Sequence, residues 1–422
     1  MRALSALGDP AKFFRNAARK GDPFCIRLPG IGEVILTGTA EGARTLFRAP
    51  PALFEPVLPN PIEPLLGPDS LILLGGARHA RERKLMAAPL CGRRMRALGG
   101  VILSAAVDAI DSRRVQTEIS AQELARDLTL EVIVRAVFGV SDPHRQAEFR
   151  RATTNMLDAY APHLSLMPQL RRRWLGLGWQ RFVDARAELD RLLVAQIARR
   201  RQLGDGPDIL SLLLEMRYED GAAMDDAAIL DELRTLLVAG HETTATGLVW
   251  ALHYVHASER VRDRLRAEVA DIDLGGRLDE VVRLPYLSAV CSEALRIHPV
   301  VPILLRRLRA PMNFLGVQLA AGTNVGVSVT LLHQDPSHYP HPERFEPERF
   351  LGSAKPEAHA YVPFGGGHRR CLGAGFATYE MKIALAAIMR SGRLTPVRGR
   401  TPKAVLRNIT MGPNMDLRFT RS

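Results

Sequence analysis

Apolar residues recur at helical spacing along most of the chain. The longest such segment, residues 225–258, is apolar enough to be buried on most sides, which predicts a central helix. At about 1.5 Å per residue this helix would be roughly 50 Å long. Other periodic or capped segments predict helices over residues 10–19, 39–47, 120–138, 149–160, 180–200, 208–216, 286–298 and 376–389.

Short apolar runs predict a smaller number of strands. Residues 24–28 and 34–37 flank Pro29 and Gly30, a pattern typical of a hairpin, and residues 409–419 form a strand-like tail. No internal repeat or low-complexity linker divides the helical segments. We therefore expect a mainly α (α+β) fold over residues 1–422, with one large helical domain and a small β-rich subdomain near the N-terminus.

Two segments lack a regular pattern. Residues 49–75 contain seven prolines, which exclude a regular helix or a central strand, and residues 162–177 are irregular and partly apolar. A long irregular segment inside a compact protein is often functional. Both are candidate lids over an apolar pocket, and a plain surface connection is the alternative for the first.

Composition and charge exclude several classes of protein. The chain of 422 residues carries a formal charge of +12, but its arginine clusters are short and lack interleaved aromatic residues. An acidic protein partner explains this charge better than a nucleic acid does. No apolar stretch reaches the length of about eighteen residues that a membrane span requires, and the first residues do not resemble a signal peptide. We expect a cytoplasmic protein without a membrane span.

The four cysteines are too far apart for a zinc ribbon or a disulfide framework, and one of them lies in a distinctive loop. Three consecutive glycines precede Cys371, and an apolar helical segment follows it, so a helix N-terminus would favour the thiolate. We interpret Cys371 as an iron ligand beneath a haem, with Arg369 placed to pair a propionate. A buried structural cysteine is the alternative, and a phosphate loop is disfavoured because no Lys-Ser or Lys-Thr pair follows.

Three further features are ambiguous when each is taken alone. In the middle of the long helix, Glu242 and Thr243 could pass protons to bound oxygen, or each could be satisfied within or beside the helix. His79 and Arg83 lie four residues apart and could bind an anionic group or form a solvated basic face. The pair Glu293 and Arg296, three residues apart, is by itself an ordinary helix ion pair.

The order and spacing of these features resemble the cytochrome P450 family of haem-thiolate monooxygenases, of the soluble bacterial type, over nearly the whole chain. The cysteine loop matches the family pattern at Phe364, Gly367, Arg369, Cys371 and Gly373. The oxygen-helix pattern matches residues 239–244, the Glu-x-x-Arg pair matches residues 293–296, and the Pro-Glu-Arg-Phe meander matches residues 347–350.

The resemblance implies a role for each matched residue. Cys371 would be the axial thiolate, and Glu242 with Thr243 the acid–alcohol pair that delivers protons. Glu293 and Arg296 would form a structural triad with the meander arginine at 349. The resemblance also implies a set of haem-binding positions, although Arg307 could replace Arg306: His79, Arg83, Arg306, Phe364, Gly365, Arg369 and Gly373.

The resemblance also implies the cofactor, the partners and the reaction. The cofactor would be haem b (iron protoporphyrin IX), and O2 with two electrons would be used to hydroxylate a lipophilic molecule such as a fatty acid, terpenoid or steroid. The electrons would come from a separate, acidic ferredoxin and a ferredoxin reductase, because no reductase is fused, and the protein would be a monomer. Alternatives are a peroxide-driven peroxygenase, which the Glu242–Thr243 pair disfavours, a tailoring oxidase of secondary metabolism, or a haem-binding sensor.

Overall fold

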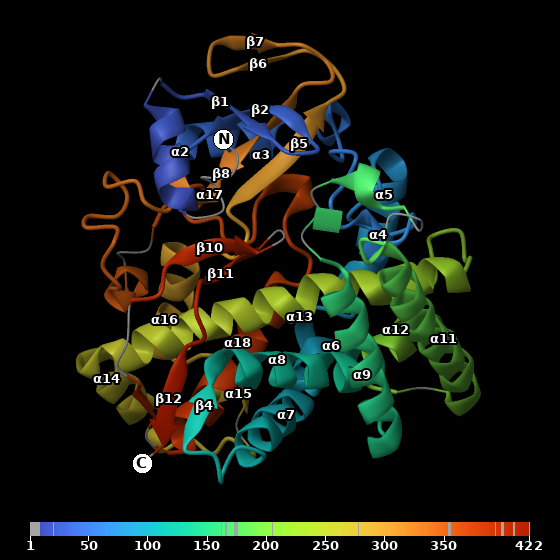
Figure 1. The fold of residues 1–422 in the computed structure, drawn as a ribbon, viewed down its shortest axis with the longest axis vertical. Coiled ribbons are helices and arrows are strands. Elements are labelled where there is room, and N and C mark those ends of the chain that lie inside the picture. The colour runs from blue at the N-terminus through green and yellow to red at the C-terminus, as the bar shows by residue number, and fades with distance from the viewer. Residues whose placement is uncertain are drawn as a thin grey trace.

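The computed structural model describes residues 9–19, 21–161, 163–164, 167–172, 176–204, 206–276, 278–352, 356–392, 394–397, 401–407 and 410–421. Helices dominate, and the longest of them crosses the middle of the molecule (Figure 1). This helix, α13 (Asp226–Ala257), packs against α16 (Pro285–Ile297) and against α18 (Ala374–Arg390), which follows Cys371 in the chain. The other helices are α2 (Pro10–Ala18), α3 (Ala40–Arg48), α4 (Glu63–Leu66), α5 (Gly76–Ala87), α6 (Gly92–Ala97), α7 (Gly99–Asp111), α8 (Ala121–Val132), α9 (Pro143–Ala159), α11 (Trp179–Leu203), α12 (Ile209–Glu215), α14 (Glu259–Ala270), α15 (Leu278–Val281) and α17 (Val329–Leu332).

Side-chain caps explain where several helices begin. The carboxylate of Asp225 accepts the Ala228 N–H at the start of α13, and the Ser120 hydroxyl accepts the Glu123 N–H at the start of α8. The predicted helix over residues 120–138 is an α-helix only as far as Val132, and it continues as a π-helical turn, Ile133–Val137. Helix α9 begins six residues before the predicted start, because Asp142 caps it and a proline follows at the first helical position.

The main sheet joins two distant parts of the sequence. Its order is β1-β2-β8-β5-β3, in which β2 and β8 are parallel and the other neighbours are antiparallel. The predicted hairpin is formed by β1 (Phe24–Leu28) and β2 (Gly32–Thr37), while β5 (Ile303–Leu308) and β8 (Asn324–Ser328) come from far along the chain. The remaining strands are β3 (Phe54–Glu55), β4 (Glu118–Ser120), β6 (Met312–Phe314), β7 (Val317–Leu319), β9 (Leu394–Pro396), β10 (Ala404–Arg407), β11 (Thr410–Pro413) and β12 (Arg418–Arg421).

The proline-rich segment is more regular than its sequence suggests. Phe54 pairs with Leu308 at the edge of the main sheet and is only 3% exposed, so it belongs to the core of the sheet and not to a lid. Further along, the Pro61 carbonyl accepts hydrogen bonds from Tyr160 and Arg171. This part of the segment is therefore held against the region after α9, where residues 162, 165–166 and 173–175 lie outside the described part of the chain.

A buried ion pair fixes the region that leads to the cysteine loop. Glu293 and Arg296 are both 0% exposed, and Arg296 Nε lies 2.6 Å from Glu293 Oε2. Arg349 adds a second guanidinium 3.4 Å from Glu293 Oε1. Burial raises the pKa of Glu293, whereas the neighbouring Arg296 favours the charged carboxylate.

Within the described residues, no helix is both long and apolar enough to cross a membrane.

Candidate functional site

The cysteine loop is a tight turn that packs against α3. The Cys371 N–H donates to the Phe364 carbonyl at 2.8 Å, and Gly365 and Gly367 have positive φ values of 68° and 64°. A Cβ atom at Gly367 would lie 2.4 Å from the carbonyl oxygen of Phe47. Glycine is therefore required at position 367 by its positive φ and by the close contact with Phe47. At Gly373, by contrast, a Cβ atom would meet nothing within 4 Å.

The Cys371 thiol is open to solvent on one side, yet enough protein surrounds it for burial to raise its pKa. The Gly373 N–H and the guanidinium groups of Arg370 and Arg83 act in the opposite direction but do not outweigh burial. The expected thiolate at a helix N-terminus is thus not favoured by the protein groups alone. A bound metal cation would reverse this balance, because a coordinating thiol is deprotonated.

Arginine and histidine side chains from three parts of the chain converge beside this loop. His79 of α5 is 5% exposed, and its ring centroid lies 6.1 Å from that of His368. Arg306 of β5 donates to the Gly366 carbonyl at 3.0 Å, and Arg369 donates to the carbonyls of residues 71, 72 and 74. Arg83 of α5 donates to the Arg370 carbonyl at 2.7 Å.

The electrostatics of this cationic cluster (Arg83, Arg306 and Arg369, with the neutral His79 and His368 beside them) indicate an anionic ligand. Burial, followed by neighbouring cationic groups, lowers the pKa of His79 and of His368 to about 4, and the pKa of Arg306 and of Arg369 to about 10. Among the described residues, no carboxylate contributes to these four shifts. Buried cations without a counter-charge are costly, so a ligand that carries carboxylates fits this cluster.

Two members of this region correct the sequence interpretation. Arg307 cannot replace Arg306, because it pairs with Glu55 on the neighbouring strand at 3.2 Å and is half-exposed. His368 was not predicted as a site residue, although it lies inside the quoted loop. His368 has no second functional residue at a regular spacing near it in the sequence, so no motif indicates it. It comes close to His79 only in the folded chain.

The central helix is open at one place in its middle. Ala239 is exposed and Thr243, one turn later, is half-exposed, whereas Leu237, His241 and Thr244 beside them are buried. Thr243 donates to the Ala239 carbonyl, and Glu242 forms an ion pair with Arg126 of α8, with Nε and Oε1 3.2 Å apart. The acid and the alcohol are thus neighbours that bond to different partners, as the alternative interpretation expected.

One short segment joins this helix face to the cysteine loop. The Leu71 N–H donates to Glu232 Oε1 at 2.7 Å, and the Leu71 carbonyl accepts from Arg369. Ala239 lies seven residues after Glu232, and Thr243 lies four residues after Ala239. The three residues therefore share one face of α13. This face and the cysteine loop therefore lie on the two sides of Leu71. Burial raises the pKa of Glu232 to about 8.

The candidate pocket-lining residues of α13, of residues 301–304 and of β11 divide into two groups. Leu236 on α13 and the run of residues 301, 303 and 304 are half-buried, as residues that border a site would be. Leu237 is 0% exposed, and Thr410 and Met411 are also buried, with the Met411 carbonyl bonded to Trp250 Nε1. These three residues belong to the core and do not line a pocket.

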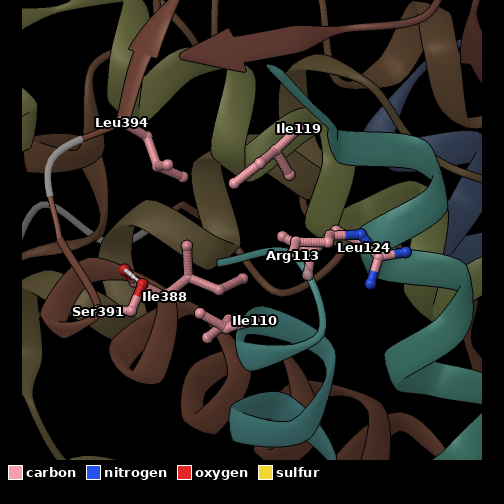
Figure 2. A pocket seen from close by; sticks show the side chains of 7 residues that line it. All are labelled: Ile110, Arg113, Ile119, Leu124, Ile388, Ser391 and Leu394. Atoms are coloured by element: carbon pink, nitrogen blue, oxygen red, sulfur yellow. Dashed lines mark hydrogen bonds between the residues drawn. The ribbon is translucent and has the colours of Figure 1, made fainter. Parts of the chain in front are cut away.

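A separate small cavity is not the site. It has a volume of about 10 Å³, room for roughly one water molecule, and lies among α7, α8, α18 and β9 (Figure 2). Arg113 borders it, and its Nε atom is buried without a hydrogen-bond partner. A single water would satisfy that nitrogen, whereas no organic substrate would fit.

Comparison with known proteins decides the family. The model of the cytochrome P450 family matches residues 6–416. The chain belongs to the cytochrome P450 family. It is 35% identical over 428 residues to cytochrome P450 135B1 of Mycobacterium tuberculosis, covering 99% of this chain and 89% of that protein. It is 33% identical over 419 residues to cytochrome P450 137 of the same species, covering 97% and 85%.

Solved structures agree with this assignment. Cyanobacterial CYP120A1 with bound retinoic acid superposes with a TM-score of 0.87 at 27% identity, over 100% of this chain and 96% of that chain. The P450 CYP102L1 gives 0.84 at 25% identity, over 98% of both chains. This P450 is therefore a haem-thiolate monooxygenase, and the predicted mainly α fold is confirmed.

The residues of the site fit haem. The cationic cluster offers donors for two carboxylates, and Cys371 is a sulfur ligand open on one side. In the part of the chain that the structure describes, no group of three His, Cys, Asp or Glu side chains could hold a bare metal ion. Iron that arrives inside a macrocycle needs only one protein ligand.

The pair Arg306 and Arg307 allows a matched test of the cationic cluster. In Arg306→Leu, haem should dissociate faster by roughly tenfold or more, because a hydrogen bond to a charged group contributes about 1.5–3 kcal/mol. Arg307→Leu should retain haem like the wild type, since it loses only the pair with Glu55. The measurement is the rate of haem transfer to apomyoglobin. Equal loss in the two variants would contradict the assignment of Arg306.

Proposed function

We propose that this P450 inserts one oxygen atom from O2 into a lipophilic small molecule, with Cys371 as the thiolate ligand of haem b. When bound, the thiolate-ligated haem supplies oxygen activation and O–O cleavage. The observation that carries the proposal is the convergence of the buried Arg306 and the half-buried Arg83 and Arg369 beside a cysteine that is open on one side. His79, Arg83, Arg306 and Arg369 would hold the propionates, while Phe364, Gly365 and Gly373 shape the loop.

Glu242 and Thr243 supply protons in this proposal. Thr243 holds a hydroxyl proton on the open face of α13, and the adjacent Glu242 reaches the solvent edge. The Thr243 hydroxyl donates to the Ala239 carbonyl of its own helix. A rotation of the Thr243 side chain would direct this donor away from the helix backbone. An acid and an alcohol placed together support O2 with two electrons over direct use of peroxide.

The substrate class follows from the apolar border of the site. The half-buried residues there are aliphatic: Leu236, Val301, Ile303 and Leu304. The similar CYP120A1 binds retinoic acid, an apolar isoprenoid chain with a carboxylate. We infer a fatty acid or terpenoid as substrate, with a steroid as a further candidate. A screen of these three classes beside a set of polar compounds for spectral shifts on binding tests this, and shifts only with the polar compounds would contradict it.

Thr243→Ala tests the proton-delivery role. The variant should divert electrons from product to hydrogen peroxide when it is driven by a ferredoxin and ferredoxin reductase with the best-binding lipid. General acid–base groups contribute roughly 10²–10⁴-fold, so the loss of coupling should be large. Thr378→Ala is the control, because Thr378 makes the same bond to the carbonyl four residues back but on α18. Full coupling in Thr243→Ala, or normal turnover with peroxide alone, would contradict the proposal.

The electron donor is proposed to be an acidic ferredoxin. Arg93, Arg94 and Arg370 are exposed beside the cysteine loop. A Cβ atom at Gly375 would lie 3.6 Å from the sulfur of Met95, which places α6 against the start of α18. A basic surface at this point would guide an acidic partner to the side of the molecule that carries Cys371.

Charge reversal tests this docking surface. The double variant Arg93→Glu/Arg94→Glu should slow reduction by ferredoxin by roughly tenfold at low salt, because steering depends on opposite charge. Substrate affinity should not change. Arg191→Glu/Arg199→Glu on α11 is the control for net charge. The proposal fails if the two double variants are reduced at the same rate.

A further inference from the structure

Helix α8 contacts α13 at the position of the proposed proton donor through two polar pairs. Arg126 Nε lies 3.2 Å from Glu242 Oε1. One turn later on α8, Thr129 Oγ1 lies 2.8 Å from His241 Nδ1. Arg126 and Thr129 are three residues apart, and so share a face of α8, while His241 and Glu242 are adjacent on α13.

The Thr129–His241 pair is one of several contacts of the same hydroxyl. Thr129 Oγ1 also lies 2.9 Å from the Ala125 carbonyl and 3.3 Å from the Arg126 carbonyl. His241 is 4% exposed, and burial, followed by the charge of Arg126, lowers its pKa to about 4. The histidine is therefore neutral near pH 7. It fixes the rotation of α13 against α8 and leaves the guanidinium of Arg126 to Glu242.

Arg126 and Glu242 lie at the boundary with solvent. Their side chains are 49% and 36% exposed, in contrast to the buried His241 beside them. Glu242 is thus directed to water and Arg126, while Thr243 points along its own helix to Ala239. On an α-helix adjacent side chains project about 100° apart. Glu242 therefore connects two environments, the solvent beside α8 and the open face of α13.

We propose that Arg126 is a positioning residue for proton uptake, an inference that rests on the proposed function. It holds the Glu242 carboxylate in water, where an oxygen of that carboxylate accepts a proton from hydronium and water is released. Glu242 then gives this proton to Thr243 Oγ1 as the Thr243 hydroxyl gives up its own. Two protons and two electrons are consumed for each O2. When delivery fails, the same two protons and electrons leave as hydrogen peroxide.

The test compares Arg126→Met with its conservative variant and its partner variant in the haem-loaded protein. Arg126→Met should raise the peroxide fraction several-fold and increase the solvent deuterium isotope effect on kcat, with KM and the spectral dissociation constant for the lipid unchanged. Arg126→Lys should recover part of the coupling, because it keeps the charge. Arg126→Met/Glu242→Gln should be no worse than Glu242→Gln alone, since both changes interrupt one route.

Two controls separate this proposal from trivial loss of structure. Arg114→Met removes another exposed arginine, paired with Asp111 away from α13, and should match the wild type. An exposed ion pair contributes little to stability, so Arg126→Met should melt close to the wild type. Wild-type coupling and isotope effect in Arg126→Met would overturn the proposal, as would additive effects in the double variant.

The outcome also separates this inference from the function on which it rests. If Thr243→Ala and Glu242→Gln uncouple the enzyme and Arg126→Met does not, only the role of Arg126 fails. If none of the three uncouples it, the proton-delivery role of Glu242 and Thr243 fails instead.

Discussion

The cysteine loop depends on the buried contact between Glu293 and Arg296. Arg296 donates to the His333 carbonyl at 2.8 Å, and His333 Nε2 accepts the Val362 N–H at 2.9 Å, two residues before the loop begins. Burial lowers the pKa of His333 to about 3, which keeps the ring neutral and able to accept. Removing one partner of a buried pair costs roughly 3–5 kcal/mol, because the other charge is left uncompensated. The pair is therefore structural, and it fixes where Cys371 lies.

The cationic cluster follows the opposite principle. Glu293 and Arg296 neutralise each other, whereas the buried Arg306 and the half-buried Arg369 have only backbone carbonyls as hydrogen-bond acceptors. A bound ligand with carboxylates would offset this cost. Local conflicts of this kind are expected at functional sites and not in the rest of a fold. The same reasoning applies to Cys371, whose thiol is neutral until a cation stabilises the thiolate.

The sequence predicted the elements whose signals are local. The long helix at residues 225–258 and the Ser120 cap are examples, because periodicity and capping depend on neighbouring residues. The Asp142–Pro143 start of α9 was missed, although the same signal was used at Asp9 and Pro10. Contacts between segments far apart in the chain could not be predicted from such local signals. Phe54 in a strand, Phe47 against the glycines, and His368 beside His79 all depend on segments far apart in the chain.

The candidate site was predicted as a set of residues more successfully than as a set of contacts. His79, Arg306 and Arg369 do come together, but Glu242 bonds to Arg126, which no motif contains.

The central claim is that Cys371 binds haem iron as a thiolate, and the spectrum of the reduced protein with carbon monoxide tests it most directly. The wild type should show the Soret band typical of thiolate ligation, and Cys371→Ser should lose it. A normal thiolate band in Cys371→Ser would contradict the account.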